Sequence, residues 1–396
     1  MTAGTSREVL FAFLRLGLTS FGGPVAHLGY FREEFVVRRR WLDEQAFGDL
    51  VALCQFLPGP ASSQVGFSLG LMRAGFRGAL AAWLGFTLPS ALALALFARG
   101  TDALQAPAAR GLLHGLEIVA VAIVAQAVWG MARTLSPDRP RAAIAVLAAL
   151  LCLADPAGQI AAIAAGAAAG LWLCRAGPPA AGSVPVAAGV PRGVALAALA
   201  AYAIALAGLP ALAAAGTHPL LGVIGAFYRA GALVFGGGHV VLPLLRDAVV
   251  GPGWVSDDAF LAGYGAAQAV PGPLFTFAAY LGAVMHAGPG GAAGAAIALC
   301  AIFLPGMLVL VGTLPFWGAL RARAGPQAAM RGINAAVVGV LAAALYSPVW
   351  TRAIGAPRDF GLALAGFVLL TVWRAPPLAV VVLGAVCGAA FALVDA

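Results

Sequence analysis

Apolar runs of about 14 to 25 residues follow one another along almost the whole chain. The longer of these runs can cross a bilayer as an α-helix. Inside lipid, every backbone N–H and C=O group needs a partner within the protein, so only helices and closed barrels span the membrane. The runs are rich in Ala, Leu and Gly and lack the alternation that marks a barrel strand. The sequence therefore predicts an all-α polytopic membrane protein.

The composition excludes several other classes of protein. Hydrophobic residues make up 62% of the chain and charged residues 10%, against roughly 25% charged residues in a soluble domain. The net charge is +8, and arginine supplies it without any lysine, with 23 arginines against 15 acidic residues. The sequence contains no solvated basic domain that could bind a nucleic acid. The five cysteines are scattered without a CxxC pair. We therefore predict no metal site, no disulfide framework and no cofactor.

Two helix-breaking motifs each occur twice inside the apolar runs. FGGP at residues 21–24 is matched by FGGG at 235–238, and PGP at 58–60 is matched by PGP at 271–273. The residues around them repeat in the same order, including Phe13 and Phe227, Arg15 and Arg229, Trp41 and Trp254, and Gln55 and Gln268. Two spaced patterns in one order indicate an internal duplication of roughly residues 9–134 as 222–350.

The duplication divides the chain into four parts. We predict a first repeat over residues 1–174, a linker rich in Pro, Gly and Ala over 175–192, a connecting transmembrane helix over 193–215, and a second repeat over 216–396. An odd number of crossings separates the starts of the two repeats. The second repeat is therefore expected to be inverted in the membrane, which is the plan of many secondary transporters.

The arginines bear on whether the broken segments cross the membrane or re-enter it. Arg32 and Arg38 to Arg40 follow the first broken segment, and Arg73 and Arg77 follow the second. If both segments crossed, these clusters would lie on opposite sides, against the positive-inside rule. We therefore favour re-entrant hairpins that turn at FGGP and PGP, although full crossings stay open because a hairpin of 22 residues reaches only about half of the bilayer.

The breaks also predict a binding site. Pro removes a backbone donor and Gly permits non-helical angles, so each break frees polar backbone groups that lipid cannot satisfy. We expect the four breaks to meet in the protein interior near mid-membrane. Helix N-termini that follow them would present free N–H groups and positive dipole ends, which suit an anion. The alternative for any one break is a packing contact or a kink.

The predicted substrate-binding residues are the breaks and their polar neighbours: Gly22, Gly23, Pro24, Gln55, Pro58, Gly59, Pro60, Ser62 and Ser63 in the first repeat, and Gly236, Gly237, Gly238, Gln268, Pro271, Gly272, Pro273 and Thr276 in the second. Arg15 and Arg229 could pair with an oxyanion or instead snorkel to the interface. His27, His239 and Glu117 could carry a coupling proton, and a satisfied structural role is the alternative for each histidine.

Enzyme chemistry finds little support in the sequence. A Walker A motif is absent, so the chain offers no ATP drive of its own. HExxH and GxSxG are also absent, and Ser62 and Ser63 have no base near them in sequence. We therefore predict that the protein is not an enzyme.

The stretches LGLTSFGGPVAHLGYF and RRRWLDEQAFGDLVALCQFLPGP, with FGGGHVVLPLL and QAVPGP in the second repeat, resemble the chromate ion transporter family in its long, two-domain form. The resemblance covers nearly all 396 residues. It implies export of chromate from the cytoplasm across a bacterial inner membrane, powered by the membrane potential or a proton gradient. It also implies competition by sulfate, a dianion of the same shape, and it adds Phe21, Trp41 and Phe235 to the implicated residues.

Two other functions stay open at this point. An anion channel on the same scaffold would give flux without substrate-stimulated exchange. A membrane enzyme such as a reductase would need a redox cofactor or a catalytic base. The expected partners are chromate or sulfate and the lipid bilayer, and two copies of the chain could also form a homodimer.

Overall fold

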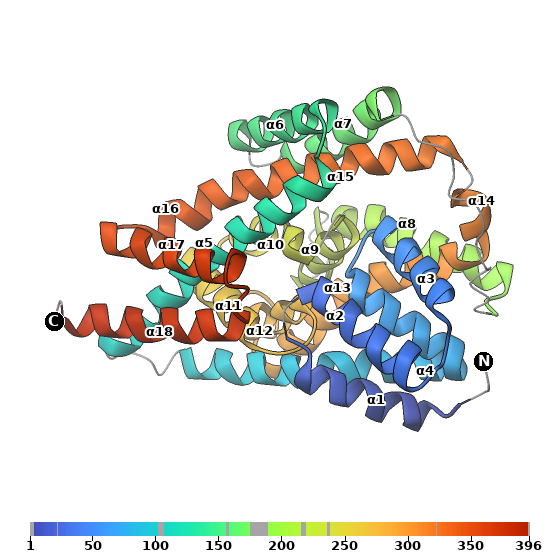
Figure 1. The fold of residues 1–396 in the computed structure, drawn as a ribbon, viewed down its shortest axis with the longest axis horizontal. Coiled ribbons are helices and arrows are strands. Elements are labelled where there is room, and N and C mark those ends of the chain that lie inside the picture. Colours follow the sequence, from blue (N-terminus) through green and yellow to red (C-terminus); the bar gives the residue numbers. More distant parts are fainter. Residues whose placement is uncertain are drawn as a thin grey trace.

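The computed structural model describes residues 4–21, 23–101, 107–155, 158–174, 189–214, 219–235, 238–321 and 323–394. Every regular element within these ranges is helical, which confirms the all-α fold class (Figure 1). Six helices in the described ranges are long and apolar enough to cross a membrane: Ala61–Gly100, Arg110–Leu135, Arg192–Ala213, Gly291–Leu320, Ala324–Ala353 and Pro377–Val394. These six helices confirm the prediction of a polytopic membrane protein.

Four helices of the first repeat end or begin next to the two motifs, FGGP and PGP. The helices of this repeat are α1 (Ser6–Thr19), α2 (Gly23–Phe31) with a π-helical turn (Arg32–Arg38), α3 (Glu44–Phe56), α4 (Ala61–Thr101), α5 (Pro107–Leu135), α6 (Arg139–Ala154) and α7 (Gly158–Leu173). Side-chain caps fix three of the starts, because Thr5 accepts a hydrogen bond from the N–H of Glu8, Asp43 from that of Ala46 and Asp138 from that of Arg141.

Helix α4 is bent sharply rather than straight. Ala74 and Gly75 leave the helical conformation, with φ +63° at Gly75, and the backbones of Gly70 and Gly78 touch across the bend. A side chain at either contact glycine would separate the two arms. The chain therefore folds back after residue 73, so that residues 61–73 form one arm, which contacts α3, and residues 76–101 form a second, longer arm.

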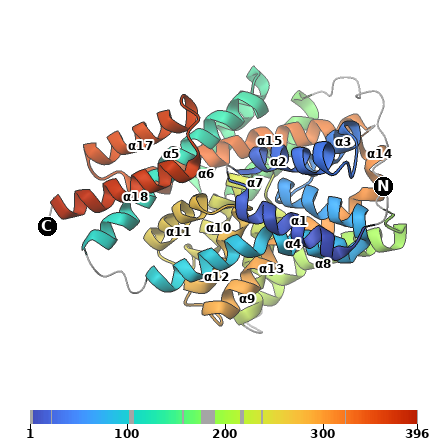
Figure 2. The same ribbon diagram turned by 60° about the horizontal axis from the view of Figure 1, so that its bottom comes forward.

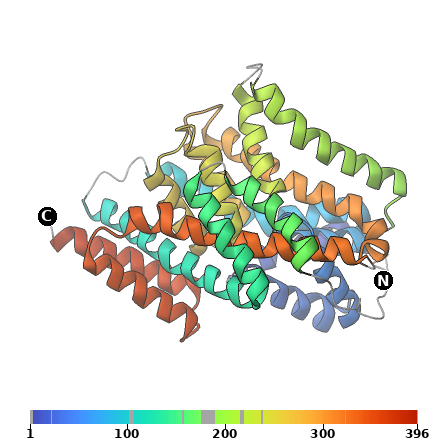
Figure 3. The same cartoon turned by 90° about the horizontal axis from the view of Figure 1, so that it is seen from above.

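The second repeat follows a connecting helix, α8 (Arg192–Ala214), which lies at the edge of the molecule (Figure 3). Its helices are α9 (Pro219–Ala232), a short turn (Gly238–Val240) with α10 (Val241–Val249), α11 (Asp257–Ala269), a short turn (Leu274–Thr276) with α12 (Phe277–Val284), α13 (Gly291–Thr313), a short turn (Leu314–Phe316) with α14 (Trp317–Arg321), α15 (Ala324–Ala344), a π-helical turn (Leu345–Trp350) with α16 (Thr351–Ala353), α17 (Pro357–Thr371) and α18 (Pro377–Val394).

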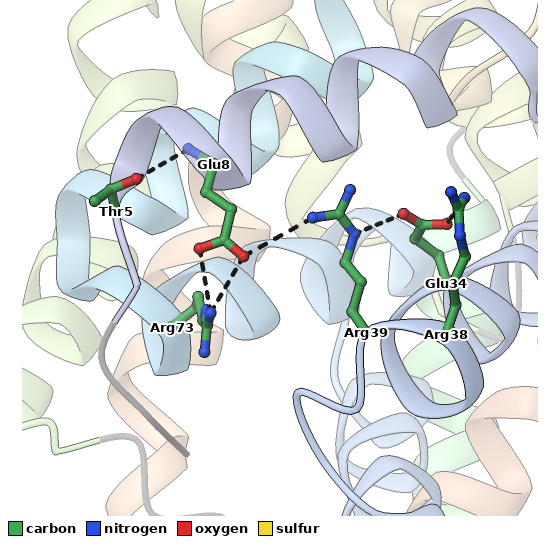
Figure 4. Close-up of polar contacts among 6 residues, drawn as sticks. All are labelled: Thr5, Glu8, Glu34, Arg38, Arg39 and Arg73. Carbon is green, nitrogen blue, oxygen red and sulfur yellow. Dashed lines mark hydrogen bonds and ion pairs between the residues drawn. The ribbon is translucent and has the colours of Figure 1, made fainter.

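Ion pairs hold the ends of the first two broken segments on one side of the molecule. Glu8, at the start of α1, lies 3.1 Å from Arg73 and 3.8 Å from Arg39, which follows the π-helical turn (Figure 4). Arg32 and Glu44 pair at 2.6 Å and join the end of the first segment to the start of the second. Each segment therefore starts and ends on the same side, as a hairpin does, and re-entry into the bilayer stays our prediction.

Glu34 belongs to the same ion-pair cluster. It lies 2.6 Å from Arg39 and 3.0 Å from Arg38 (Figure 4). Burial alone would raise the pKa of Glu34, but its hydrogen bonds and ion pairs with Arg39 and Arg38 outweigh burial and lower the pKa below its ordinary value. The carboxylate is therefore held in its charged form where the hairpin ends meet.

The second repeat reproduces one of these ion pairs and one backbone feature at equivalent positions. Arg246 pairs with Asp257 at 2.9 Å, as Arg32 pairs with Glu44. The loop residue before each tryptophan also has the same backbone conformation, with φ +51° at Arg40 and +77° at Gly253. The two repeats therefore fold alike in their hairpin regions.

The repeats are interlocked through their outer helices. Gly111 and Gly115 of α5 touch the backbone of α18 at Gly388 and Gly384, and Figure 2 shows α17 and α18 beside α5. Conversely, Gly332 of α15 touches α7 at Gly166 and Gly170. Small residues allow helices to approach closely in a membrane. Since α5 and α15 are repeat-equivalent, as are α7 and α18, each repeat packs its last helix against the other repeat.

Candidate functional site

The two PGP turns are hydrogen-bonded to the opposite repeat. The N–H of Gly59 donates to the carbonyl of Val234 at 2.7 Å, and the N–H of Gly272 donates to the carbonyl of Ser20 at 2.9 Å. Ser20 and Val234 are the residues directly before the two FGG motifs. The two hydrogen bonds join equivalent residues, with the first and second repeats exchanged between donor and acceptor. A pseudo-two-fold axis between the repeats produces this relation. The structure thus joins each PGP break to the FGG break of the other repeat.

Glycine is required at the centre of both turns. Gly59 has φ +116° and Gly272 has φ +102°, in the region that favours glycine. A Cβ at Gly59 would lie 2.9 Å from the Cα of Gly306, and one at Gly272 would lie 2.8 Å from the Oγ of Ser90. Gly306 and Ser90 each follow a proline inside a long helix, α13 or α4. Each turn therefore packs against the proline region of a helix in the other repeat.

The two FGG breaks also approach each other. A Cβ at Gly238 would lie 3.4 Å from Cγ of Pro24, and Gly23 has φ +79° at the start of α2. Gly22, Gly236 and Gly237 lie outside the described residues. Among the described residues of the four breaks, the contacts therefore form one connected group at the interface of the repeats.

A glutamine that the sequence analysis did not select links this group together. Gln64 is fully buried, and its amide donates to the carbonyls of Pro58 and Gly306, each at 2.9 Å. The predicted Gln55 is instead exposed at the end of α3. The position of Gln64, one turn after PGP, was visible in the sequence. Its partner Gly306 was not, because a contact with α13 exists only in the folded protein.

Polar side chains of the first repeat surround the start of α4. His27 is buried, and its Nδ1 lies 3.3 Å from the Oγ of Ser62. In the described part of the chain, His27 Nε2 and the hydroxyls of Ser20, Ser63 and Thr87 are buried without a hydrogen-bond partner. The first backbone N–H groups of α4 also have no partner within the helix. This end of α4 can therefore offer several neutral donors to an anion.

The second repeat is less polar at the equivalent place. Residues 62–64 are Ser, Ser and Gln, whereas the equivalent residues 275–277 are Phe, Thr and Phe. The hydroxyl of Thr276 already donates to the carbonyl of Pro273 at 2.8 Å. His239 contacts the hydroxyl of Tyr264 at 2.7 Å, and the amide nitrogen of Gln268 is buried without a partner. Free donors therefore gather mainly on the first-repeat side of the interface.

Three charged candidates lie elsewhere. Arg15 is exposed on α1, and Arg229 lines a cavity of about 560 Å³ between α7, α8, α9 and α10. Glu117 lines another cavity, of about 660 Å³, and lies 3.3 Å from His114, which is 3.5 Å from Asp359. Over the described residues, no hydrogen bond or ion pair joins these three to the breaks. The structure thus brings the histidines and hydroxyls to the breaks and leaves these charges apart.

Trp41 lies at the hairpin ends. It is buried, with the guanidinium of Arg39 5.7 Å and that of Arg73 5.1 Å from its ring centre. Cation–π contacts of this kind fix an arginine over an aromatic face. Trp41 therefore ties the ends of the first and second hairpins together.

Comparison with known proteins agrees with this architecture. The chromate transporter family matches residues 7–171 and 221–389, one match in each repeat. The chromate transport protein of Pseudomonas aeruginosa is 32% identical over 387 residues, which cover 92% of this chain and 87% of that protein. The probable chromate transport protein of Synechococcus elongatus is 28% identical over 396 residues, which cover 96% of this chain and 94% of that protein.

A third relative, the chromate transport protein of Cupriavidus metallidurans, is 29% identical over 356 residues, which cover 86% of this chain and 82% of that protein. No solved structure matches the chain. The family matches span both duplicated halves and include all four breaks, and the relatives align over most of their length, so the resemblance seen in the motifs is confirmed. With two interlocked helical repeats that join at paired FGG and PGP breaks, this chain belongs to the chromate transporter family.

Proposed function

We propose that the protein is a secondary transporter that exports chromate from the cytoplasm and accepts sulfate as a competing substrate. Membership of the chromate transporter family supports chromate transport. The oxyanion-binding site that we propose is supported by one observation: the four breaks are joined across the repeats. They lie next to the N-terminus of α4, where buried hydrogen-bond donors have no partner. Such a helix end favours an anion through its N–H groups and its dipole.

The proposed substrate site uses neutral donors. Ser62, Ser63 and His27 would bind the oxyanion together with the first N–H groups of α4, and Gln64 would hold the PGP turn in position. A hydrogen bond to a charged group contributes about 1.5–3 kcal/mol, so a few such donors suffice for a dianion. Chromate and sulfate offer the same tetrahedral set of acceptors, which is why we expect them to compete.

Transport would follow from movement of one repeat against the other. The hydrogen bonds from Gly59 to Val234 and from Gly272 to Ser20 are the contacts that such a movement would break and remake. An inside-negative potential favours exit of a dianion by about 4.6 kcal/mol per 100 mV, since each charge contributes about 2.3 kcal/mol. His27, which is buried beside Ser62, is our candidate for a proton that couples to transport.

Flux in liposomes tests this proposal. Purified protein is reconstituted into vesicles loaded with radiolabelled chromate, and exit is measured with an imposed inside-negative potential, a pH gradient, or neither. We expect saturable exit that the potential accelerates and that sulfate inhibits. Exchange that is faster with chromate or sulfate on the far side would separate a transporter from an anion channel. Absence of chromate flux from folded protein under every gradient would contradict the proposal.

A further inference from the structure

The cavity that Arg229 lines lies apart from the breaks, on the outer flank of the second repeat. Its walls come from the start of α7, the end of α8, and helices α9 and α10. We propose that this cavity binds the headgroup of a phospholipid that carries a primary amine, with the phosphate at Arg229 and the ammonium group at Asp247 and Gln159.

Comparison of the two repeats explains why the cavity is open. In the first repeat the equivalent place is filled by the ion-pair cluster of Glu8, Glu34, Arg38 and Arg39 (Figure 4). Trp41 lies beside this cluster. The equivalent residues that line the cavity of the second repeat are Gly222, Ala248, Gly251 and Pro252, beside Trp254. Small residues thus replace long charged ones, and the space that the cluster fills in one repeat is left empty in the other.

The polar groups of the cavity match a zwitterionic headgroup. Arg229 is exposed to the cavity, and within the described ranges no carboxylate oxygen lies within 4.0 Å of its guanidinium. Asp247 accepts a hydrogen bond from the amide of Gln159. The carbonyl oxygen of Gln159 is buried without a partner, on a residue that is only 8% exposed. One cation and two nearby acceptors are thus available, and an oxyanion alone would leave the acceptors unused.

The apolar walls of the cavity and its expected position near the membrane interface favour a lipid over a soluble zwitterion. Ile160, Pro210 and Leu244 lie on the walls, and α8 beside them has only 6% of its apolar window buried, so it faces lipid. In the inverted topology that we predict, the cavity lies on the side opposite the arginine-rich hairpin ends. The positive-inside rule then places the cavity in the outer leaflet. Trp254 fits the belt of tryptophans at a membrane interface.

Native mass spectrometry of the full-length protein in detergent tests the inference, with phosphatidylethanolamine and phosphatidylglycerol added separately at equal concentration. We expect the wild type to retain phosphatidylethanolamine at least several-fold better. Arg229→Gln should lose most bound lipid. Asp247→Asn should keep binding but lose the preference between the two lipids. Gly222→Leu should fill the cavity and lower occupancy, since a Cβ at Gly222 meets nothing within 4 Å.

The matched control is Arg15→Gln, which removes the repeat-equivalent arginine from the exposed face of α1. It should bind lipid as the wild type does, and size-exclusion profiles should show that every variant is folded. Equal retention of the two lipids by the wild type would overturn the inference, as would equal lipid loss in Arg229→Gln and Arg15→Gln. Displacement of the lipid by millimolar sulfate would identify the cavity as a site for free anions instead. None of these readouts depends on transport.

Discussion

Replacement of Gly59 by alanine tests the packing of the repeats at the breaks. Gly59 has φ +116°, and an added Cβ would lie 2.9 Å from the Cα of Gly306 and 3.1 Å from the amide nitrogen of Gln64. Both the turn and α13 present backbone at this contact, so neither can yield by a side-chain rotation. The turn must therefore withdraw from α13 and weaken the hydrogen bond from Gly59 to Val234.

The expected cost is the sum of two effects. A residue other than glycine in such a conformation costs about 1–3 kcal/mol. Loss of one backbone hydrogen bond costs about 0.5–1.5 kcal/mol, and more if the carbonyl of Val234 stays buried without a partner. We therefore expect Gly59→Ala to lower the free energy of unfolding by about 2–4 kcal/mol.

Gly75→Ala is the matched control. Gly75 also has a positive φ, +63°, but a Cβ there meets nothing within 4 Å, so only the conformational cost of about 1–3 kcal/mol applies. Thermal unfolding of the purified variants in one detergent, followed by loss of the monodisperse peak, compares the two. We expect the larger fall in melting temperature for Gly59→Ala. Equal losses would refute the contact between the PGP turn and α13.

Three further changes test other parts of the structure. Ser63→Ala removes a buried hydroxyl that has no hydrogen-bond partner, so the melting temperature should not fall. The loss of one hydrogen bond to the anion should raise the KM for chromate roughly tenfold or more. An unchanged KM would show that Ser63 is not part of the substrate site. In a cysteine-free background, single cysteines that replace the exposed Arg40 and Arg77 should react with an impermeant thiol reagent from the same side of the membrane. A cysteine that replaces the exposed Gly253 should react from the opposite side. Reaction of positions 40 and 77 from opposite sides would exclude the hairpins. Because the pKa of Glu34 is lowered in the folded protein, its charge stabilises the fold above the ordinary carboxyl pKa of 4.5, and this stabilisation is lost as the pH falls through the lowered pKa. The melting temperature of Glu34→Gln should therefore be below that of the wild type at pH 7, and the gap between the two should shrink below pH 4.5. A gap in melting temperature that does not change with pH would contradict this role.

The sequence alone determined the class of the fold and the duplication. Runs of apolar residues long enough to span a bilayer leave the backbone no alternative to helices, because lipid supplies no hydrogen bonds. The motif pairs around Gly22 and Gly236, and around Gly59 and Gly272, were sufficient to align the two halves. Both conclusions depend on composition and spacing, which do not require knowledge of a contact.

Which polar residues lie together was decided by the tertiary structure. The sequence offered Gln55 and Ser62 as substrate-binding residues, Arg229 as a partner for an oxyanion and His27 as a proton carrier, because all four lie near a break. Helical rotation then exposes Gln55 and turns Arg229 into a separate cavity, while His27 and Ser62 meet in the interior. A position in sequence fixes distance along a helix, but the direction of a side chain depends on how the helix packs.

The cross-repeat contacts could not be read from the sequence at all. Gly59 meets Val234 and Gly306, which are separated from it by more than half of the first repeat and the connecting helix, and no local pattern encodes those pairings. The duplication allows a contact in one repeat to have an equivalent in the other, as the pair formed by Gly272 and Ser20 shows. Which surfaces of the repeats face each other depends on the close fit of glycine-bearing helices, and that fit exists only once the whole chain has packed.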